Sequence, residues 1–202
     1  MSALSRSRPV PTALLTPAPG LMLLKARAHE ACGPARHSFA MMLARAASGP
    51  VFWIRHALAD GRMNGCGIIP WLEPARLIFV TASRANDLLW TVEEVLRSGV
   101  VPLVVAELPE PPPLTPVRRL HLAAESTGSN PTALLLTPGD GGAQGVESRW
   151  HMAPAPGWAA PGGHPAWTLT RRRARMAPEA AWHVERRGDS LHTAPVAIPE
   201  PA

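Results

Sequence analysis

Long apolar runs are absent from this sequence. The longest candidates, residues 100–108 and 133–136, fall short of the roughly 20 consecutive apolar residues with which a helix spans a bilayer. Cysteine is scarce as well: Cys32 and Cys66 occur in a chain without a recognisable secretory signal, which favours free thiols in a reducing compartment. We therefore expect a soluble, cytoplasmic protein that has no disulfide.

Acidic residues are missing from the start of the chain, where the first is Glu30. The basic residues before it would suit a targeting peptide, but prolines 9, 11, 17 and 19 interrupt any apolar or amphipathic helix there. The sequence therefore predicts a disordered N-terminal tail over residues 1–20. Because 24 prolines and 16 glycines also favour loose ends, we expect a second disordered tail over residues 196–202.

Short apolar runs alternate with amphipathic stretches in the first three quarters of the chain. The runs at residues 51–54, 77–80, 100–106 and 133–136 are typical of buried strands. Between them, residues 33–47, 83–98 and 115–127 have apolar positions at helical spacing, with glycine or proline near their ends. This pattern predicts an α/β core over residues 21–148, with a mostly parallel sheet covered by helices on both faces.

The texture changes at Arg149. Beyond it, Trp150, Trp167 and Trp182 lie in short segments of alternating character, separated by loops rich in proline and glycine. We interpret residues 149–195 as an antiparallel β extension that packs on the core or on a partner.

Three stretches carry a family resemblance. They read HEACGPARHSF over residues 29–39, RLIFVTASRANDLLWTVEEVLRSGVVPLVVAEL over residues 76–108, and LTPVRRLHLAAESTGSNPTALLLTP over residues 114–138, followed by SRWHMAPAPG. Their order is similar to that of the RecA core, and the later stretches resemble the accessory proteins of bacterial damage-induced mutagenesis cassettes, the ImuA-type or SulA-like family. The resemblance covers roughly residues 28–187 and implies a three-layer RecA-like fold.

The position of the phosphate-binding loop departs from the ATPase pattern. A working loop reads G-x-x-x-x-G-K-[ST], because backbone N–H groups wrap the phosphates, the lysine neutralises them and the hydroxyl holds Mg²⁺. Here Gly33 and Pro34 are followed by Arg36 and Ser38, without a second glycine or a lysine. The alternative interpretation of this segment is a simple helix start.

Two further residues fall at catalytic positions on the family pattern. Arg55, before His-Ala-Leu, stands where the RecA strand carries its catalytic glutamate, and arginine cannot accept a proton from water. Glu107 falls where the pattern places the acid linked to Mg²⁺, although a surface carboxylate at a strand end is the simpler interpretation. We therefore expect no ATP hydrolysis.

A metal site is also unsupported. His29, Cys32 and His37 are close in sequence, but structural zinc takes four ligands in paired clusters and no second cysteine cluster exists. We expect no metal and no other cofactor.

The net charge of +5 favours an anionic partner, and basic residues cluster near the C-terminus. On a strand, Arg171, Arg173 and Arg175 would share one face with Trp167. Such a face could grip the phosphates of single-stranded DNA while Trp167 and Trp182 stack on bases, or it could bind a protein. An exposed strand whose aromatic end packs on the core is the alternative.

The resemblance implies a non-catalytic protein that acts in SOS mutagenesis and translesion DNA synthesis. Its expected partners are a polymerase-like adaptor and an error-prone DNA polymerase of the same cassette. Two alternatives stay open: a nucleotide-dependent DNA-binding ATPase, which the loop and Arg55 oppose, and a cell-division inhibitor of the SulA-like type.

Overall fold

A computed structural model describes residues 14–59, 63–156 and 163–198 of the 202-residue chain. The helices in chain order are α1 (Arg36–Ala46), α2 (Gly65–Ile68), the 3-10 helix η1 (Pro74–Arg76), α3 (Ala85–Ser98) and α4 (Leu114–Glu125). The strands are β1 (Leu14–Ala18), β2 (Leu21–Leu24), β3 (Ala28–Cys32), β4 (Val51–His56), β5 (Leu77–Ala82), β6 (Leu103–Glu107), β7 (Thr132–Leu136), β8 (Ser148–Pro154), β9 (Ala166–Ala174), β10 (Ala180–Arg187) and β11 (Ser190–Val196).

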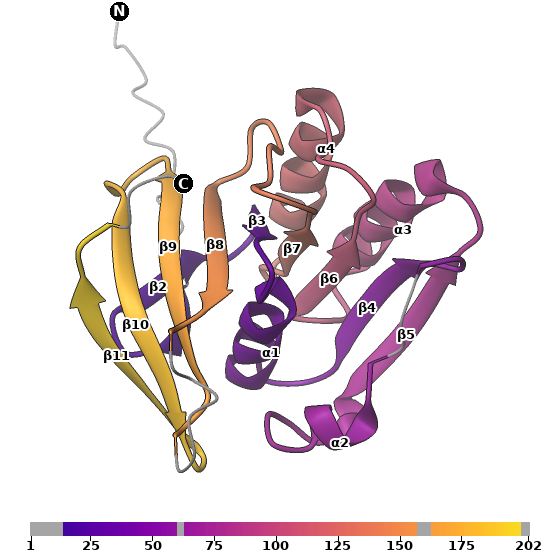
Figure 1. Ribbon diagram of the computed structural model, residues 1–202. Coiled ribbons are helices and arrows are strands. Elements are labelled where there is room, and N and C mark those ends of the chain that lie inside the picture. Colours follow the sequence, from indigo (N-terminus) through magenta and orange to yellow (C-terminus); the bar gives the residue numbers. More distant parts are fainter. Residues whose placement is uncertain (1–13, 60–62, 157–162, 199–202) are drawn as a thin grey trace, which may run out of the picture.

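A nine-stranded sheet organises the described residues, in the order β11-β10-β9-β8-β3-β7-β6-β4-β5. All pairings from β8 to β5 are parallel, and all pairings from β8 to β11 are antiparallel. Figure 1 shows the two halves as one continuous, twisted sheet that joins where β8 lies beside β3. The prediction of a RecA-like α/β core with a mostly parallel sheet and a C-terminal antiparallel extension is confirmed.

The central parallel strands β6 and β7 are apolar on both faces because helices cover both. On β6, Leu103 and Val105 join the hydrophobic cluster around α1, whereas Val104 and Ala106 join the cluster around α3 and α4. The same alternation occurs on β7. This burial on both sides explains why these strands read as continuous apolar runs.

The N-terminal expectation needs a correction. Leu14–Ala18 forms β1, which pairs with β2 in a separate hairpin, and Leu15, Leu21 and Leu23 are buried in the cluster around α1. Gly20, with φ +77°, provides the turn. Prolines 17 and 19 thus lie in and beside a strand, and residues 1–13 of the predicted tail lie outside the described residues. At the other end β11 continues to Val196, and residues 199–202 are outside the described part.

The described residues include no helix that is long and apolar enough to cross a membrane.

Candidate functional site

The loop between β3 and α1, where the resemblance places the phosphate-binding site, is short and closed. Gly33 has φ +86°, and a Cβ atom there would lie 2.5 Å from the Met152 carbonyl oxygen and 2.7 Å from Nε2 of His151. Strand β8 therefore presses directly on this loop. Position 33 requires glycine because of this close approach and the positive φ. The approaching atoms belong to strand β8 of the protein itself.

The backbone N–H groups of this loop are already engaged. Gly33 donates to the Gly139 carbonyl at 2.9 Å, and Ala35 donates to the Met152 carbonyl at 2.9 Å. Arg36 turns back on the loop, because its guanidinium donates to the Gly33 carbonyl at 3.2 Å. Ser38 donates its backbone N–H to the Ala35 carbonyl as part of the first helical turn. Pro34 has no N–H to offer.

Glu107, at the end of β6, is held by protein donors. The Trp53 indole N–H donates to its carboxylate at 2.6 Å, and Nε2 of His37 lies 3.7 Å away. The His37 ring stacks on the Trp53 ring at 6.2 Å between centroids. Burial alone would raise the pKa of Glu107, but the hydrogen bonds from His37 and Trp53 and the nearby charge of Arg55 together lower it.

Arg55 lies on β4, two residues after Trp53, and is only 9% exposed. Its guanidinium donates to the Ala59 carbonyl at 2.6 Å. The structure thus brings Arg55, Glu107 and the β3–α1 loop to the carboxyl ends of the neighbouring parallel strands. The space beside Glu107 is occupied by His37 and Trp53, whose involvement the sequence pattern did not suggest.

A second polar centre, missed by the sequence analysis, lies at the middle of β3. Glu30 is fully buried and accepts hydrogen bonds from the Thr137 hydroxyl and from the backbone N–H groups of Gly142 and Ala143, at 2.7 to 2.9 Å. Arg149 forms an ion pair with the same carboxylate. Glu30 thereby clamps the loop 137–147 onto the sheet. No clear signal in the sequence identified it, because His29 and Glu30 together interrupt the apolar pattern of β3.

The neighbouring residue His29 forms a neutral network on the other face. Its Nε2 lies 2.8 Å from the Leu24 carbonyl, which can only accept, so Nε2 carries the proton. Nδ1 then accepts from the Ser148 hydroxyl at 2.6 Å, and Ser148 accepts from the Trp150 indole at 2.7 Å. Burial lowers the pKa of His29 to about 4, which keeps the ring uncharged.

The three residues considered as metal ligands do not converge. His29 contacts Leu24 and Ser148, His37 contacts Glu107, and the Cys32 thiol donates to the Trp150 carbonyl at 3.5 Å. Burial and the nearby Glu30 raise the pKa of Cys32 to about 12, so the thiol is protonated. The described residues contain no group of three or more side chains with the geometry for a metal ion.

The tryptophans of the extension are packed against the core. Trp150 is fully buried, and Trp167 and Trp182 are each 9% exposed. Trp150 contacts Phe39 of α1 and Trp182, with centroids 5.5 and 5.8 Å apart. These indole faces are largely covered by protein.

The arginines of β9 do not share one face, and this expectation was wrong. Arg171 pairs with Trp150, whereas Arg173 pairs with Arg149, so the β9 register slips by one residue between them. Such a bulge shifts the side-chain alternation, and it places Arg171 with Trp150 on the α1 face and Arg173 with Arg149 on the opposite face. Arg175 follows on that opposite face, where it lies 3.7 Å from Glu147.

Arg171 and Arg173 therefore have different environments. The Arg171 guanidinium lies over the rings of Trp150 and Trp182, 5.7 and 5.2 Å from their centroids, and donates to the Pro178 carbonyl. Arg173 is exposed and forms no ion pair within the described residues. Only the second position offers a cation to an external partner.

Fold and site together define a RecA-like α/β protein in which protein groups fill the edge of the sheet where the resemblance places the nucleotide site. No family model matches the chain. It is similar to the curated Protein ImuA of Caulobacter vibrioides strain NA1000 / CB15N, with 34% identity over 149 residues, which is 66% of this chain and 59% of the relative. Protein ImuA of strain ATCC 19089 / CIP 103742 / CB 15 matches to the same extent. The chain thus spans about three fifths of the length of these relatives.

Proposed function

We propose that this chain is an ImuA-type accessory protein of damage-induced mutagenesis that acts without hydrolysing ATP. The similarity to Protein ImuA supports the family and the role, and the resemblance of the sequence to RecA-like cassette proteins points the same way. In this role the chain works in the bacterial cytoplasm beside an error-prone polymerase and a polymerase-like adaptor, through contacts between proteins.

The closed β3–α1 loop is the observation that carries the non-catalytic part. Phosphate binding by such a loop depends on free backbone N–H groups at a helix start. Here the N–H groups of Gly33 and Ala35 donate to carbonyls of neighbouring segments. Glu107 accepts from the Trp53 indole, and Arg55 replaces the residue that would activate water.

Nucleotide binding tests this proposal directly. We expect no change in the melting temperature of the purified full chain when ATP and Mg²⁺ are added. A ligand that binds only the folded state at 100 times its dissociation constant would add about 2.7 kcal/mol of stability, which a melting curve resolves easily. A Mg²⁺-dependent rise in melting temperature, or ATP turnover above that of a denatured sample, contradicts the proposal.

The Arg55→Glu variant sharpens this test. It restores a carboxylate at the family's catalytic position but leaves the loop closed, so we expect it to remain inactive. Turnover gained by this single change would mean that the loop still binds nucleotide and that Arg55 alone blocks the reaction.

For the adaptor we propose a contact on the extension, at the face that carries Arg173. Helices α3 and α4 lie over the strands from β3 to β5, and no helix of the described residues lies over β9–β11 on this side (Figure 1). Arg173 is exposed there without an ion pair to a described residue, and exposed arginines are enriched at protein interfaces. The α1 face of the same strands is buried and is not available.

Arg173→Glu tests the adaptor contact without disturbing the buried face. We expect reduced co-purification with the adaptor and a lower damage-induced mutation frequency, with an unchanged circular dichroism spectrum. Normal co-purification by this variant contradicts the placement of the interface. Normal mutation frequency after deletion of the gene contradicts the role in mutagenesis.

A further inference from the structure

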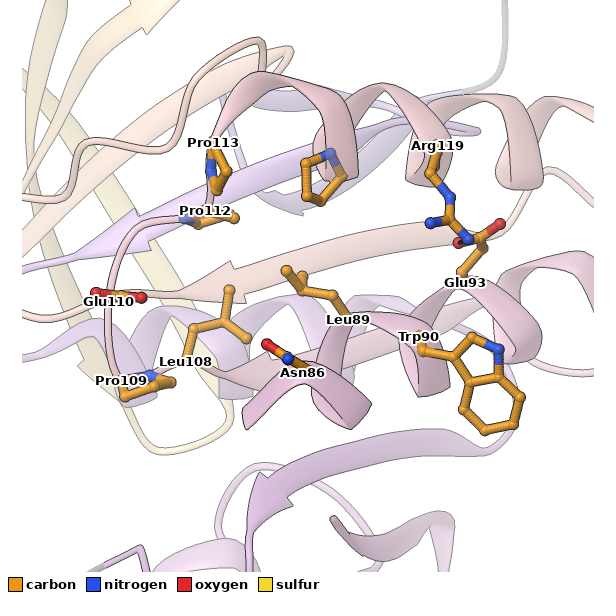
Figure 2. Close-up of a pocket in the computed structure, with 11 residues that line it drawn as sticks. Asn86, Leu89, Trp90, Glu93, Leu108, Pro109, Glu110, Pro112, Pro113 and Arg119 are labelled. Carbon is orange, nitrogen blue, oxygen red and sulfur yellow. Dashed lines mark ion pairs between the residues drawn. The ribbon is translucent and has the colours of Figure 1, made fainter. Parts of the chain in front are cut away.

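A preformed hollow of about 410 Å³ lies between α3 and α4, on the side of the sheet away from α1. Figure 2 shows how its wall is built from both helices and from the loop that follows β6. The lining is mainly apolar and includes Leu89, Leu108 and prolines 109, 112 and 113. This hollow is separate from the β3–α1 loop and from the extension.

One buried carboxylate forms two ion pairs beside the hollow, one of which links α3 and α4. Glu93 of α3 is 5% exposed, and its carboxylate lies 2.6 Å from Arg97 and 2.7 Å from Arg119 of α4. The pairing with Arg119 joins the two helices, because Glu93 belongs to α3 and Arg119 to α4. The groove is thus a stable feature of the folded chain.

The two ends of the groove have opposite character. Trp90 and Arg119 lie at one end, and Pro109 and Glu110 lie at the other (Figure 2). Trp90 is 59% exposed and projects as a large apolar side chain beside the hollow. Glu110 is exposed and forms no ion pair with any residue in the described part of the chain.

We propose that a second copy of this chain occupies the groove, in a two-fold symmetric dimer. A two-fold contact requires a surface that is complementary to itself. When two such grooves meet in opposite directions, Trp90 of each copy packs against the proline-lined end of the other. Glu110 of each copy then faces Arg119 of the other, so the apolar side chains and the opposite charges are both matched.

The surface favours a second copy over an unrelated protein because it carries both a hollow and a projecting side chain, and both a cation and an anion. A groove for another protein needs a cavity but needs no projecting tryptophan and no pair of opposite charges arranged end to end. Trp and Arg are also the residues that contribute most often to interface hot spots, and Trp90 would be such a hot spot. The inference goes beyond the proposed function and does not depend on it.

Light scattering coupled to size-exclusion chromatography, with sedimentation equilibrium, tests the proposal on the full chain at micromolar concentration. We expect a dimer whose dissociation constant rises at least roughly tenfold in Trp90→Ala, as for an interface hot spot. Glu110→Lys should also weaken it, because two cations would then meet at each end. Neither change removes a buried group, and circular dichroism checks that both variants fold.

Matched controls lie in the connection between β9 and β10, whose residues do not line the groove. Met176→Ala truncates an 86% exposed apolar side chain, and Glu179→Lys reverses an exposed charge; both should leave the dimer unchanged. A wild-type chain that stays monomeric overturns the proposal and leaves the groove to a segment of another protein. A dimer that survives both Trp90→Ala and Glu110→Lys also overturns it, because the contact must then lie elsewhere.

Discussion

Strands β3, β8 and β9 stabilise the two faces of the sheet by different means. On the α1 face, Trp150 is buried against Phe39, and the polar residue His29 is kept neutral by a closed set of hydrogen bonds. On the opposite face, the charged residues Glu30 and Arg149 form an ion pair beneath the loop 137–147. His29 and Glu30 are neighbours on β3, and each offsets the cost of burying a polar group in a different way. His29 stays neutral and hydrogen-bonded, whereas Glu30 is charged and ion-paired.

The two solutions respond differently to change. A neutral hydrogen bond contributes about 1 kcal/mol to stability. Removing one partner of a buried ion pair costs several times more, because the remaining charge is buried without a counter-ion. The loss of stability caused by a mutation should therefore differ in size between the two faces, and so should its dependence on pH.

The largest effect should come from Glu30→Ala. It leaves the Arg149 guanidinium without its counter-ion, and the Thr137 hydroxyl and two backbone N–H groups without an acceptor. We expect a loss of about 3 to 5 kcal/mol in the free energy of unfolding. Urea denaturation of the purified protein measures it. Glu179→Ala, at an exposed position, should change stability by less than about 0.5 kcal/mol. A loss at Glu30 as small as at Glu179 contradicts the clamp.

The stability contributed by the α1 face should depend more strongly on acid pH than that of the opposite face, because His29 lies there. Its pKa is about 4 in the folded state against 6.5 in the unfolded chain, so the unfolded state binds the proton first as pH falls. Stability is therefore fully present above pH 6.5 and is lost as pH falls toward 4, by on the order of 3 kcal/mol.

His29→Gln removes this titration and separates it from other groups. The variant should be less stable at neutral pH, because it loses the Leu24–His29–Ser148 network, and its stability should fall less steeply between pH 6.5 and 4. Some slope should remain because burial also lowers the pKa of His121. Urea denaturation across this pH range gives both curves, and parallel curves would mean that folding does not lower the pKa of His29.

The same comparison explains what the sequence could predict. Strands β4 to β7 are apolar on both faces, so their runs stand out without knowledge of their neighbours. Strand β3 does not stand out, because His29 and Glu30 interrupt it. Apart from the Leu24 carbonyl, the partners of these two side chains lie 107 to 119 residues away. Only the folded chain shows that these polar residues belong inside.

The candidate site also has features that the sequence could predict and features that it could not. The glycine of the β3–α1 loop and the positions of Arg55 and Glu107 could be located from the order of segments. The role of Trp53 could not, because it depends on strands β4 and β6 lying side by side. The sequence also did not predict on which face of the sheet each β9 arginine lies. A bulge shifts the alternation of side chains by one residue and leaves no clear signal in the sequence.

The smallest expected effect tests that bulge. Arg171 lies over two tryptophan rings on the α1 face, and Arg173 is exposed on the other. Arg171→Ala should cost about 1 to 2 kcal/mol, because it removes a partly desolvated cation–π contact and the hydrogen bond to the Pro178 carbonyl. Arg173→Ala, which deletes the same side chain two residues further on, should change stability by less than about 0.5 kcal/mol. Urea denaturation followed by tryptophan fluorescence should also show a changed native emission for Arg171→Ala alone, since only that side chain touches Trp150 and Trp182. Equal losses and equal spectra for the two variants would show that both arginines face the same side and that the register does not slip.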